Sequence, residues 1–164
     1  MSINIAMKAC SPKLKDLIRA IRQHEFERPL AVTLTMKLRA NGQSNDRIIA
    51  STNCRHFLNR LNARLFGSAA KRYGRKLDVF SVLEENAEGR LHFHMIVDCP
   101  ADRYIADVSA AIREEWPRTD FGYRHIEIKA ITDDGWLSYM LKRRQKGGNL
   151  LDSIDWANCT TILG

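Results

Sequence analysis

The sequence predicts an α+β fold in which a mostly antiparallel sheet of four to five strands is built by a split β-α-β unit, with helices packed on it. Three observations favour this class. Alternating apolar and polar residues mark four strands, patterns with a period near 3.6 mark helices, and the order after a first helix is β-α-β-β-α-β-α. A chain of 164 residues without an internal repeat or a low-complexity linker indicates one domain.

The first half of the chain supplies the opening elements. Residues 12–23 show helical spacing of leucine and isoleucine after Ser11 and Pro12, which suit a helix start. Residues 30–38 alternate as a half-exposed strand, with Thr33, Thr35 and Lys37 on the polar side. Asn41 and Gly42 break this strand. A long helix is expected over 45–66, ended by Gly67.

The second half repeats the alternation of strands and helices. Strands are expected at 77–85, 91–99 and 121–131, and helices at about 102–116 and 133–146. Residues 149–164 receive no assignment. In the usual arrangement of a split β-α-β sheet, the strands at 30–38 and 91–99 are central neighbours.

Two histidines on one strand are the clearest sign of chemistry. Because side chains alternate along a strand, His92 and His94 project from the same face, about 7 Å apart at the backbone. Phe93, Met95 and Val97 then point toward a core. Two such imidazoles form half of a metal site. The alternative is a pair of exposed polar residues on a half-buried strand.

The preceding hairpin selects a third ligand. A three-residue loop at 87–89, with Gly89 in the left-handed conformation, places Glu84 opposite His92. Directly opposed residues share a face with Cβ atoms about 5 Å apart, so Glu84 points toward the histidines and Glu85 points away. Two imidazoles and a carboxylate leave positions for substrate oxygens, which suits Mn²⁺ or Mg²⁺. Glu84 is otherwise one of several surface acids of the hairpin.

The helix expected at 133–146 carries a candidate nucleophile. Tyr139 and Lys142 lie one helical turn apart, and three further cations follow, which are Arg143, Arg144 and Lys146. Neighbouring cations favour the phenolate form of a tyrosine, and a nucleophile needs such activation. The alternative is an amphipathic helix that faces the core through its apolar residues, with Tyr139 at the border.

Composition limits the partners and the compartment. The net charge of +7 favours a polyanion, with nucleic acid first. No stretch has the length of a membrane span and the N-terminus lacks a signal-peptide pattern, so we expect a cytoplasmic protein that does not act at a membrane. Four scattered cysteines without a Cys-x-x-Cys pair indicate neither a zinc knuckle nor a disulfide framework.

Together, and in this order, three motifs resemble the HUH endonuclease superfamily, specifically the small rolling-circle replication initiators (Rep proteins) with one catalytic tyrosine. The motifs are Val32-Thr33-Leu34-Thr35, His92-Phe93-His94 and Tyr139-Met140-Leu141-Lys142. The resemblance spans about residues 30–146. It differs from the three-histidine relaxase branch, because no third histidine closely follows His94.

The resemblance implies an HUH-like fold and metal-dependent nicking and joining of single-stranded DNA at the origin or end of an element. Tyr139 would form a 5′-phosphotyrosine, and Lys142 would lower its pKa or neutralise phosphate charge. Glu84, His92 and His94 would hold the metal. The expected DNA contacts are Thr33, Thr35, Lys37, Arg143, Arg144 and Lys146. The sequence has no Walker A pattern, so we expect a replication helicase to come from the host.

Three alternatives stay open at this point. A transposase or a relaxase would share the same chemistry. A non-catalytic RNA- or ssDNA-binding module could use a ferredoxin- or RRM-like sheet, although such a sheet carries exposed aromatics on its central strands. A metal-dependent hydrolase would use activated water instead of Tyr139 and would leave no protein–DNA adduct.

Overall fold

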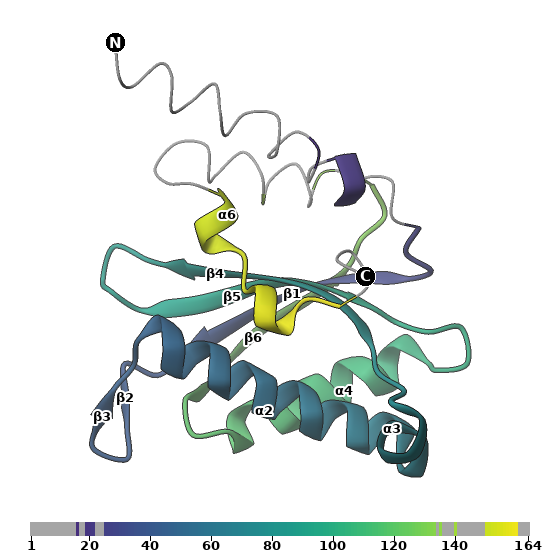
Figure 1. Cartoon of the computed structure of the whole chain (residues 1–164), viewed down its shortest axis with the longest axis horizontal. Helices are drawn as coiled ribbons and strands as arrows, with labels where there is room; N and C mark the ends of the chain where they lie inside the picture. The colour runs from purple at the N-terminus through teal and green to yellow at the C-terminus, as the bar shows by residue number, and fades with distance from the viewer. Residues whose placement is uncertain are drawn as a thin grey trace.

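The four expected strands form one antiparallel sheet, in the order β4-β5-β1-β6 (Figure 1). The computed structural model describes residues 16, 19–21, 25–133, 135, 140 and 150–160. The strands are β1 (Pro29–Met36), β4 (Asp78–Glu85), β5 (Leu91–Asp98) and β6 (Gly122–Ala130). Strands β5 and β1 are the central neighbours, so the α+β class and the split β-α-β order are confirmed.

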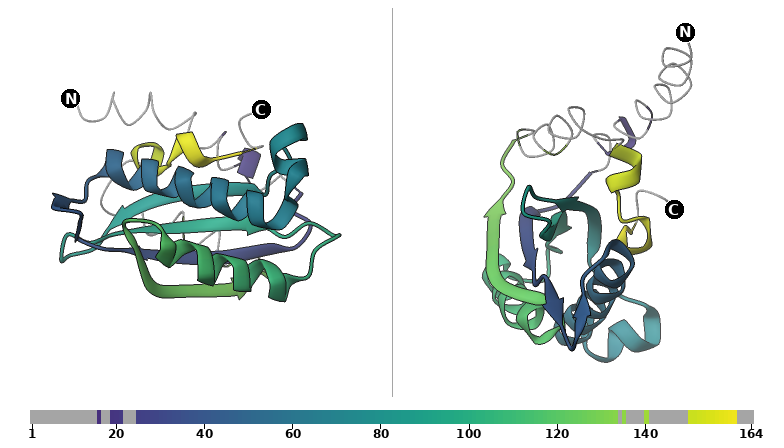
Figure 2. Two further views of the ribbon diagram at one scale, coloured as in Figure 1. Left: turned by 90° about the horizontal axis from the view of Figure 1, so that it is seen from below. Right: turned by 90° about the vertical axis from the view of Figure 1, so that its left-hand side faces the viewer.

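Three helices lie along one face of this sheet (Figures 1 and 2). Helix α2 (Arg47–Phe66) begins after Asp46, whose carboxylate accepts a hydrogen bond from the Ile49 amide, and ends at Gly67. A short helix that the sequence did not indicate, α3 (Ser68–Tyr73), follows directly. Helix α4 (Ile105–Glu115) continues into the 3₁₀ turn η1 (Trp116–Arg118), which contains Pro117.

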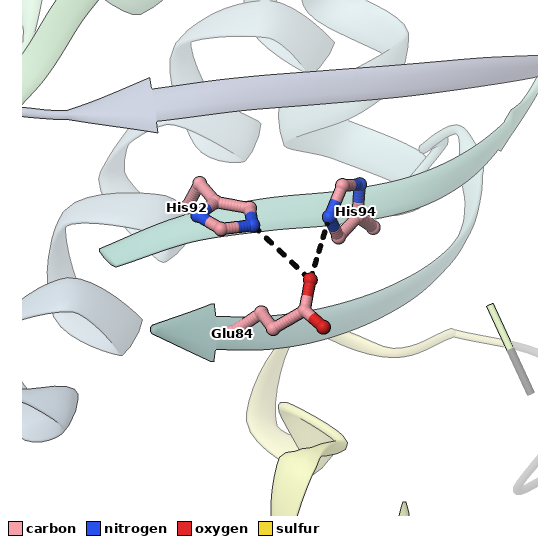
Figure 3. A group of neighbouring side chains, drawn as sticks. All are labelled: Glu84, His92 and His94. Carbon is pink, nitrogen blue, oxygen red and sulfur yellow. Dashed lines mark hydrogen bonds and ion pairs between the residues drawn. The ribbon is translucent and has the colours of Figure 1, made fainter. Parts of the chain in front are cut away.

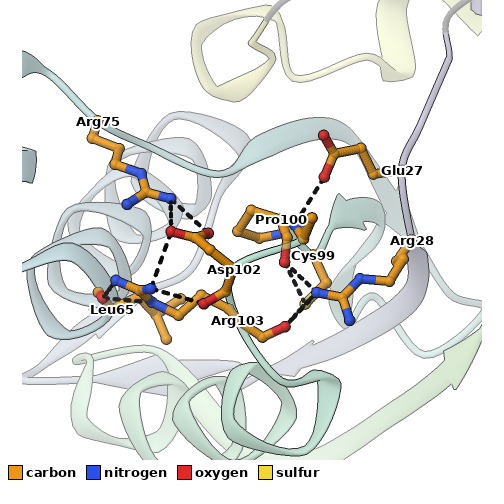
Figure 4. A network of polar contacts seen from close by, with 9 residues as sticks. Glu27, Arg28, Leu65, Arg75, Cys99, Pro100, Asp102 and Arg103 are labelled. Atoms are coloured by element: carbon orange, nitrogen blue, oxygen red, sulfur yellow. Dashed lines mark hydrogen bonds and ion pairs between the residues drawn. The ribbon is translucent and has the colours of Figure 1, made fainter.

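Helix α4 starts three residues later than expected because the loop before it is fixed by polar contacts (Figure 4). The Arg28 guanidinium donates to the carbonyls of Pro100 and Arg103. Arg103 in turn donates to the Leu65 carbonyl at the end of α2. Asp102 pairs with Arg75 at 2.7 Å. These contacts tie the end of β5 to the end of α2.

A small hairpin projects between β1 and α2. Its strands are β2 (Arg39–Ala40) and β3 (Gln43–Ser44), and Asn41 and Gly42 make the turn with φ values of 50° and 76°. Two central residues with positive φ form the tight turn that suits a two-residue hairpin loop. The expected break in the strand is therefore a reversal of the chain, and β1 ends at Met36 instead of Leu38.

The main core lies between the sheet and the helices, with Trp116 at its centre. Its side chain is fully buried and meets Phe57 and Phe93 edge-on, at ring-centroid distances of 5.2 and 6.2 Å. The indole N–H donates to the Thr35 carbonyl at 2.9 Å, which satisfies the polar end of a buried tryptophan. The main core therefore contacts the backbone of β1 directly.

A second, smaller apolar cluster covers part of the opposite sheet face. Its buried members come from β4, β5, the N-terminal region, the region after β6 and the tail, and they are Ile21, Phe80, Val82, Ile96, Met140 and Ile154. The described residues of the two remaining expected helices, 12–23 and 133–146, include 19–21, 135 and 140, which are helical. Over the described residues, no helix has the length and apolarity needed to cross a membrane.

The tail that the sequence left unassigned runs along the free edge of β4. After α6 (Leu150–Ser153), Ile154 bridges to Val82, and the amide of Asp155 donates to the Ser81 carbonyl at 3.0 Å. The turn η2 (Trp156–Asn158) follows, and the Thr160 amide donates to the Val79 carbonyl at 2.8 Å. The tail thereby satisfies backbone groups that an edge strand would otherwise leave unpaired.

The start of β6 depends on a close backbone approach at Gly122. A Cβ atom there would lie 1.9 Å from the Trp116 carbonyl oxygen. We expect Gly122→Ala to destabilise the protein by about 3 kcal/mol or more, because the obstacle is backbone and not a flexible side chain. Gly42→Asn should cost less than about 1 kcal/mol, since asparagine tolerates positive φ. Denaturant midpoints of the two variants measure the difference, and equal midpoints would contradict this account.

Candidate metal centre

The β4–β5 hairpin sets the position of the central acid. The Asn86 amide donates to the Arg90 carbonyl at 3.0 Å, and Gly89 adopts a φ of 80°. The Asn86 side chain accepts from the amides of Glu88 and Arg90, which closes the loop. Glu84 consequently pairs with His92, and Glu85 pairs with Leu91. The hairpin register expected from the sequence is confirmed.

Three side chains converge on the face of the sheet that lies opposite α2 (Figure 3). Glu84 Oε2 lies 2.8 Å from His94 Nε2 and 3.1 Å from His92 Nε2. The two imidazole rings stand nearly perpendicular, at 87°, with centroids 4.8 Å apart. One possible ligand atom from each residue lies within 4.8 Å of the other two, so this group could hold a metal ion.

The burial of these side chains suits a cation site. Their exposed fractions are 18 % for Glu84, 14 % for His92 and 8 % for His94. Partial burial strengthens the attraction between a cation and the carboxylate, because less water screens it. Two nitrogens and one carboxylate fill only part of the coordination shell of a divalent ion, and substrate oxygens can occupy the rest.

Strand β1 supplies a partner for one imidazole. Thr33 pairs with His94 in the sheet, and its Oγ1 lies 3.2 Å from His94 Nδ1. With the Nδ1 proton donated to this hydroxyl, the Nε2 lone pair points to the side where Glu84 lies. Metal-binding histidines in proteins almost always have such a partner on their second nitrogen, since it fixes the ring and the tautomer. The donor set and its support therefore fit a bound cation.

Two further residues that are expected to contact DNA, Thr35 and Lys37, lie at and just after the end of β1. Thr35 pairs with His92, while its Oγ1 lies 3.3 Å from His125 Nδ1 on β6. Lys37 follows the end of β1, and its Nζ donates to the Asp120 carbonyl at 3.3 Å. His125 is exposed on β6, and its contact with Thr35 depends on the β1–β6 pairing, which no local pattern in the sequence reveals.

The expected nucleophile and its neighbouring cations lie outside the described residues; these are Tyr139, Lys142, Arg143, Arg144 and Lys146. Met140 is described, and it is buried in the second apolar cluster with Phe80, Val82 and Ile96. Phe80 and Val82 share a face of β4 with Glu84, and Ile96 shares a face of β5 with His94, because these residues lie two positions apart. The chain at residue 140 therefore returns to the sheet face that carries the metal group.

The described cysteines are free thiols without features of a reactive site. Burial raises the pKa of Cys159 to about 11, and burial also raises the pKa of Cys54 well above its ordinary value. Both side chains are therefore protonated at neutral pH, whereas a nucleophilic or metal-bound cysteine must be a thiolate. Among the described residues, the Glu84-His92-His94 group is the one cluster of metal-ligating side chains.

Comparison with known proteins points to one family. The family model for Replication-associated protein ORF2 matches residues 29–148, which include β1, the metal group and the expected nucleophile region. No curated protein and no solved structure matches the chain.

Removing the carboxylate from the group tests its capacity for metal. We expect Glu84→Ala to weaken Mn²⁺ binding at least about 100-fold, since even partners that only support a ligand affect affinity about 10- to 100-fold. Glu85→Ala is the matched control, because this neighbouring acid projects from the other face. Titration with Mn²⁺, followed by the electron paramagnetic resonance signal of the free ion, gives both constants. Equal losses in the two variants would contradict the assignment.

The Thr33 hydroxyl provides a second test. Thr33→Val keeps the β-branched shape but removes the partner of His94 Nδ1, so Mn²⁺ affinity should fall about 10-fold or more. Thr35→Val is the control, because the Thr35 hydroxyl contacts His125 and not His94. The Mn²⁺ affinity of this variant should stay near that of wild type. If the same titration ranks the two variants equally, the hydroxyl does not position His94.

Proposed function

Because the chain belongs to the Replication-associated protein ORF2 family, we propose that it nicks and joins single-stranded DNA at a specific sequence and so initiates rolling-circle replication of a plasmid, phage or related mobile element. The observation that carries this proposal is the convergence of Glu84, His92 and His94 on the open sheet face. A protein that only recognised DNA would have no need for this group.

In the proposed reaction, Glu84 and the two histidines hold one divalent cation, Mn²⁺ or Mg²⁺. When bound, such an ion polarises the scissile phosphate, a Lewis-acid role. The Thr33 hydroxyl keeps the His94 ring in place, and the hairpin keeps Glu84 opposite His92. The ligands thus come from a rigid part of the sheet, which limits reorganisation during the reaction.

Tyr139 is the proposed nucleophile. Its phenolic oxygen attacks the phosphorus, the bond from phosphorus to the 3′-oxygen breaks, and a 5′-phosphotyrosine and a 3′-hydroxyl result. The proton lost by the phenol balances the proton gained by the leaving 3′-oxygen. Lys142, one helical turn away in the expected helix, would stabilise the phenolate or the phosphate charge. Because the adduct keeps a phosphodiester bond, the reverse step joins ends without ATP.

Two observations support this choice of tyrosine. The family match extends to residue 148 and so includes Tyr139 and Lys142. Met140, the next residue, is buried on the metal face of the sheet. The proposed DNA contacts are the polar β1 side chains Thr33 and Thr35 with Lys37, and the basic residues Arg143, Arg144 and Lys146. The net charge of +7 agrees with a polyanionic substrate.

The alternative functions differ in observable ways. A transposase or a relaxase would form the same adduct, so only the DNA target distinguishes it. A non-catalytic RNA-binding module is disfavoured, because the open positions of β1 and β5 carry threonine and histidine where such a sheet carries aromatics. A hydrolase that uses water would cleave DNA without forming an adduct.

The covalent bond gives the sharpest test. With Mn²⁺ and a pool of randomised single-stranded DNA, wild type should form an SDS-resistant adduct that a denaturing gel resolves. Tyr139→Phe should form none, because only the phenolic oxygen is lost, while its stability and metal binding change little. Tyr104→Phe, at an exposed position outside this region, is the control and should react as wild type does. An adduct in Tyr139→Phe, or a nucleotide mapped to another tyrosine by mass spectrometry, would overturn the assignment.

A further inference from the structure

On the sheet face that carries the metal group, an aromatic ring and a cation lie beyond His92. Tyr123, the second residue of β6, keeps 38 % of its surface exposed. The guanidinium carbon of Arg90 lies 5.4 Å from the centroid of the Tyr123 ring, within the range of a cation–π contact. Arg90 also donates to the Met36 carbonyl at 3.0 Å, so its side chain reaches across the end of β1 toward β6.

Both residues lie on the same side of the sheet as the metal group. Leu91 is buried in the main core, and alternation therefore directs Arg90 to the face of His92. The β1–β6 register shifts between the Leu34 and Met36 pairs, so the contact with Arg90, and not alternation, places the Tyr123 ring on that side. Tyr123 and Arg90 thus extend the row formed by His92, Thr35 and His125, one step further along the sheet.

Backbone contacts position the start of the strand that carries this ring. A Cβ atom at Gly122 would lie 1.9 Å from the Trp116 carbonyl oxygen, so the backbone packs closely where β6 begins. The Lys37 amide donates to the Phe121 carbonyl at 2.8 Å, which ties the end of β1 to the residue before β6. A partly exposed ring beside a cation is an arrangement with which proteins hold single-stranded nucleic acid, since every base offers a face for stacking.

We propose that Tyr123 and Arg90 form a stacking platform for one unpaired nucleobase of the single-stranded DNA whose scissile phosphate enters the metal centre. Arg90 lies beside the ring and neutralises a neighbouring phosphate. The platform rests on the proposed function and gives a reason why the protein would prefer single-stranded DNA. A base within a duplex has both faces covered and cannot stack on the ring. Stacking accepts any base, so the platform holds the strand and does not read its sequence.

The test distinguishes binding through the bases from binding through the charge of the DNA backbone. Fluorescence anisotropy in EDTA measures binding of a short oligothymidine and of an abasic oligomer with the same length and charge. Wild type should prefer oligothymidine. Tyr123→Ala should lower that affinity roughly 5- to 150-fold, which corresponds to the ~1–3 kcal/mol of one stacked base, and should leave the abasic oligomer nearly unaffected.

Two control variants sharpen the result. Tyr123→Phe keeps the ring and should bind oligothymidine as wild type does. Tyr104→Ala removes a tyrosine that is 77 % exposed next to α4, and it should change neither affinity. Thermal melting of each variant shows whether it is folded. A folded Tyr123→Ala that loses both probes equally would overturn the platform, because Tyr123 would then affect the surface as a whole.

The outcomes also separate this inference from the proposed function. If Tyr123→Ala keeps the full preference for oligothymidine while wild type still cleaves DNA, the platform is wrong and the proposed function stands. If wild type binds neither probe and forms no adduct, both are wrong. If the preference falls in Tyr123→Ala but no protein forms an adduct, the platform stands as a DNA-binding feature and the nicking reaction is wrong.

Discussion

The pairing of β5 with its two neighbours is the constraint on which the described site depends. Because side chains alternate, a slip of one residue would turn His92 and His94 into the main core and Phe93 out to solvent. The core prevents this slip, since Phe93 is fully buried against Trp116. The Trp116 indole also donates to the carbonyl of Thr35, the partner of His92. Packing on one face therefore sets the position of the polar groups on the other.

The open face is divided between an apolar part and a polar part. Along β4 and β5, Phe80, Val82 and Ile96 join the second cluster, while Glu84 and His94 follow directly in the same rows. The cluster draws together segments far apart in the chain, from Ile21 to Ile154. This arrangement brings residue 140, which follows β6, back to the sheet face that carries the site on β4 and β5, and its apolar contact offsets part of the entropy of closing the chain.

The parts of the site that the sequence predicted are those that depend on local geometry. Alternation alone placed His92 beside His94, and a three-residue loop with Gly89 was enough to choose Glu84 over Glu85. The contact of Thr33 with His94 joins residues 61 positions apart, and the contact of Thr35 with His125 joins residues 90 apart. Such contacts follow from strand order and from the bulge in the β1–β6 pairing, and neither leaves a periodic signal in the sequence. The tail escaped prediction for a related reason, because the buried polar side chains of Asp155 and Asn158 bond to each other and to Ser51, which lies on α2.

One face of the sheet packs on the main core and the other carries the polar site, and the turn before β6 connects the two. Stability comes mainly from the face with α2 and α4, where the large side chains are fully buried. The polar face holds a carboxylate and two imidazoles close together, an arrangement that contributes little to stability and needs the rigid sheet to persist. The turn over residues 116–122 connects the two faces. It begins with Trp116 in the main core and ends at the start of β6, the strand that carries Tyr123 and His125. A change in this turn would therefore disturb the core and the polar surface together, whereas a change at His92 or Tyr123 would affect the polar surface alone.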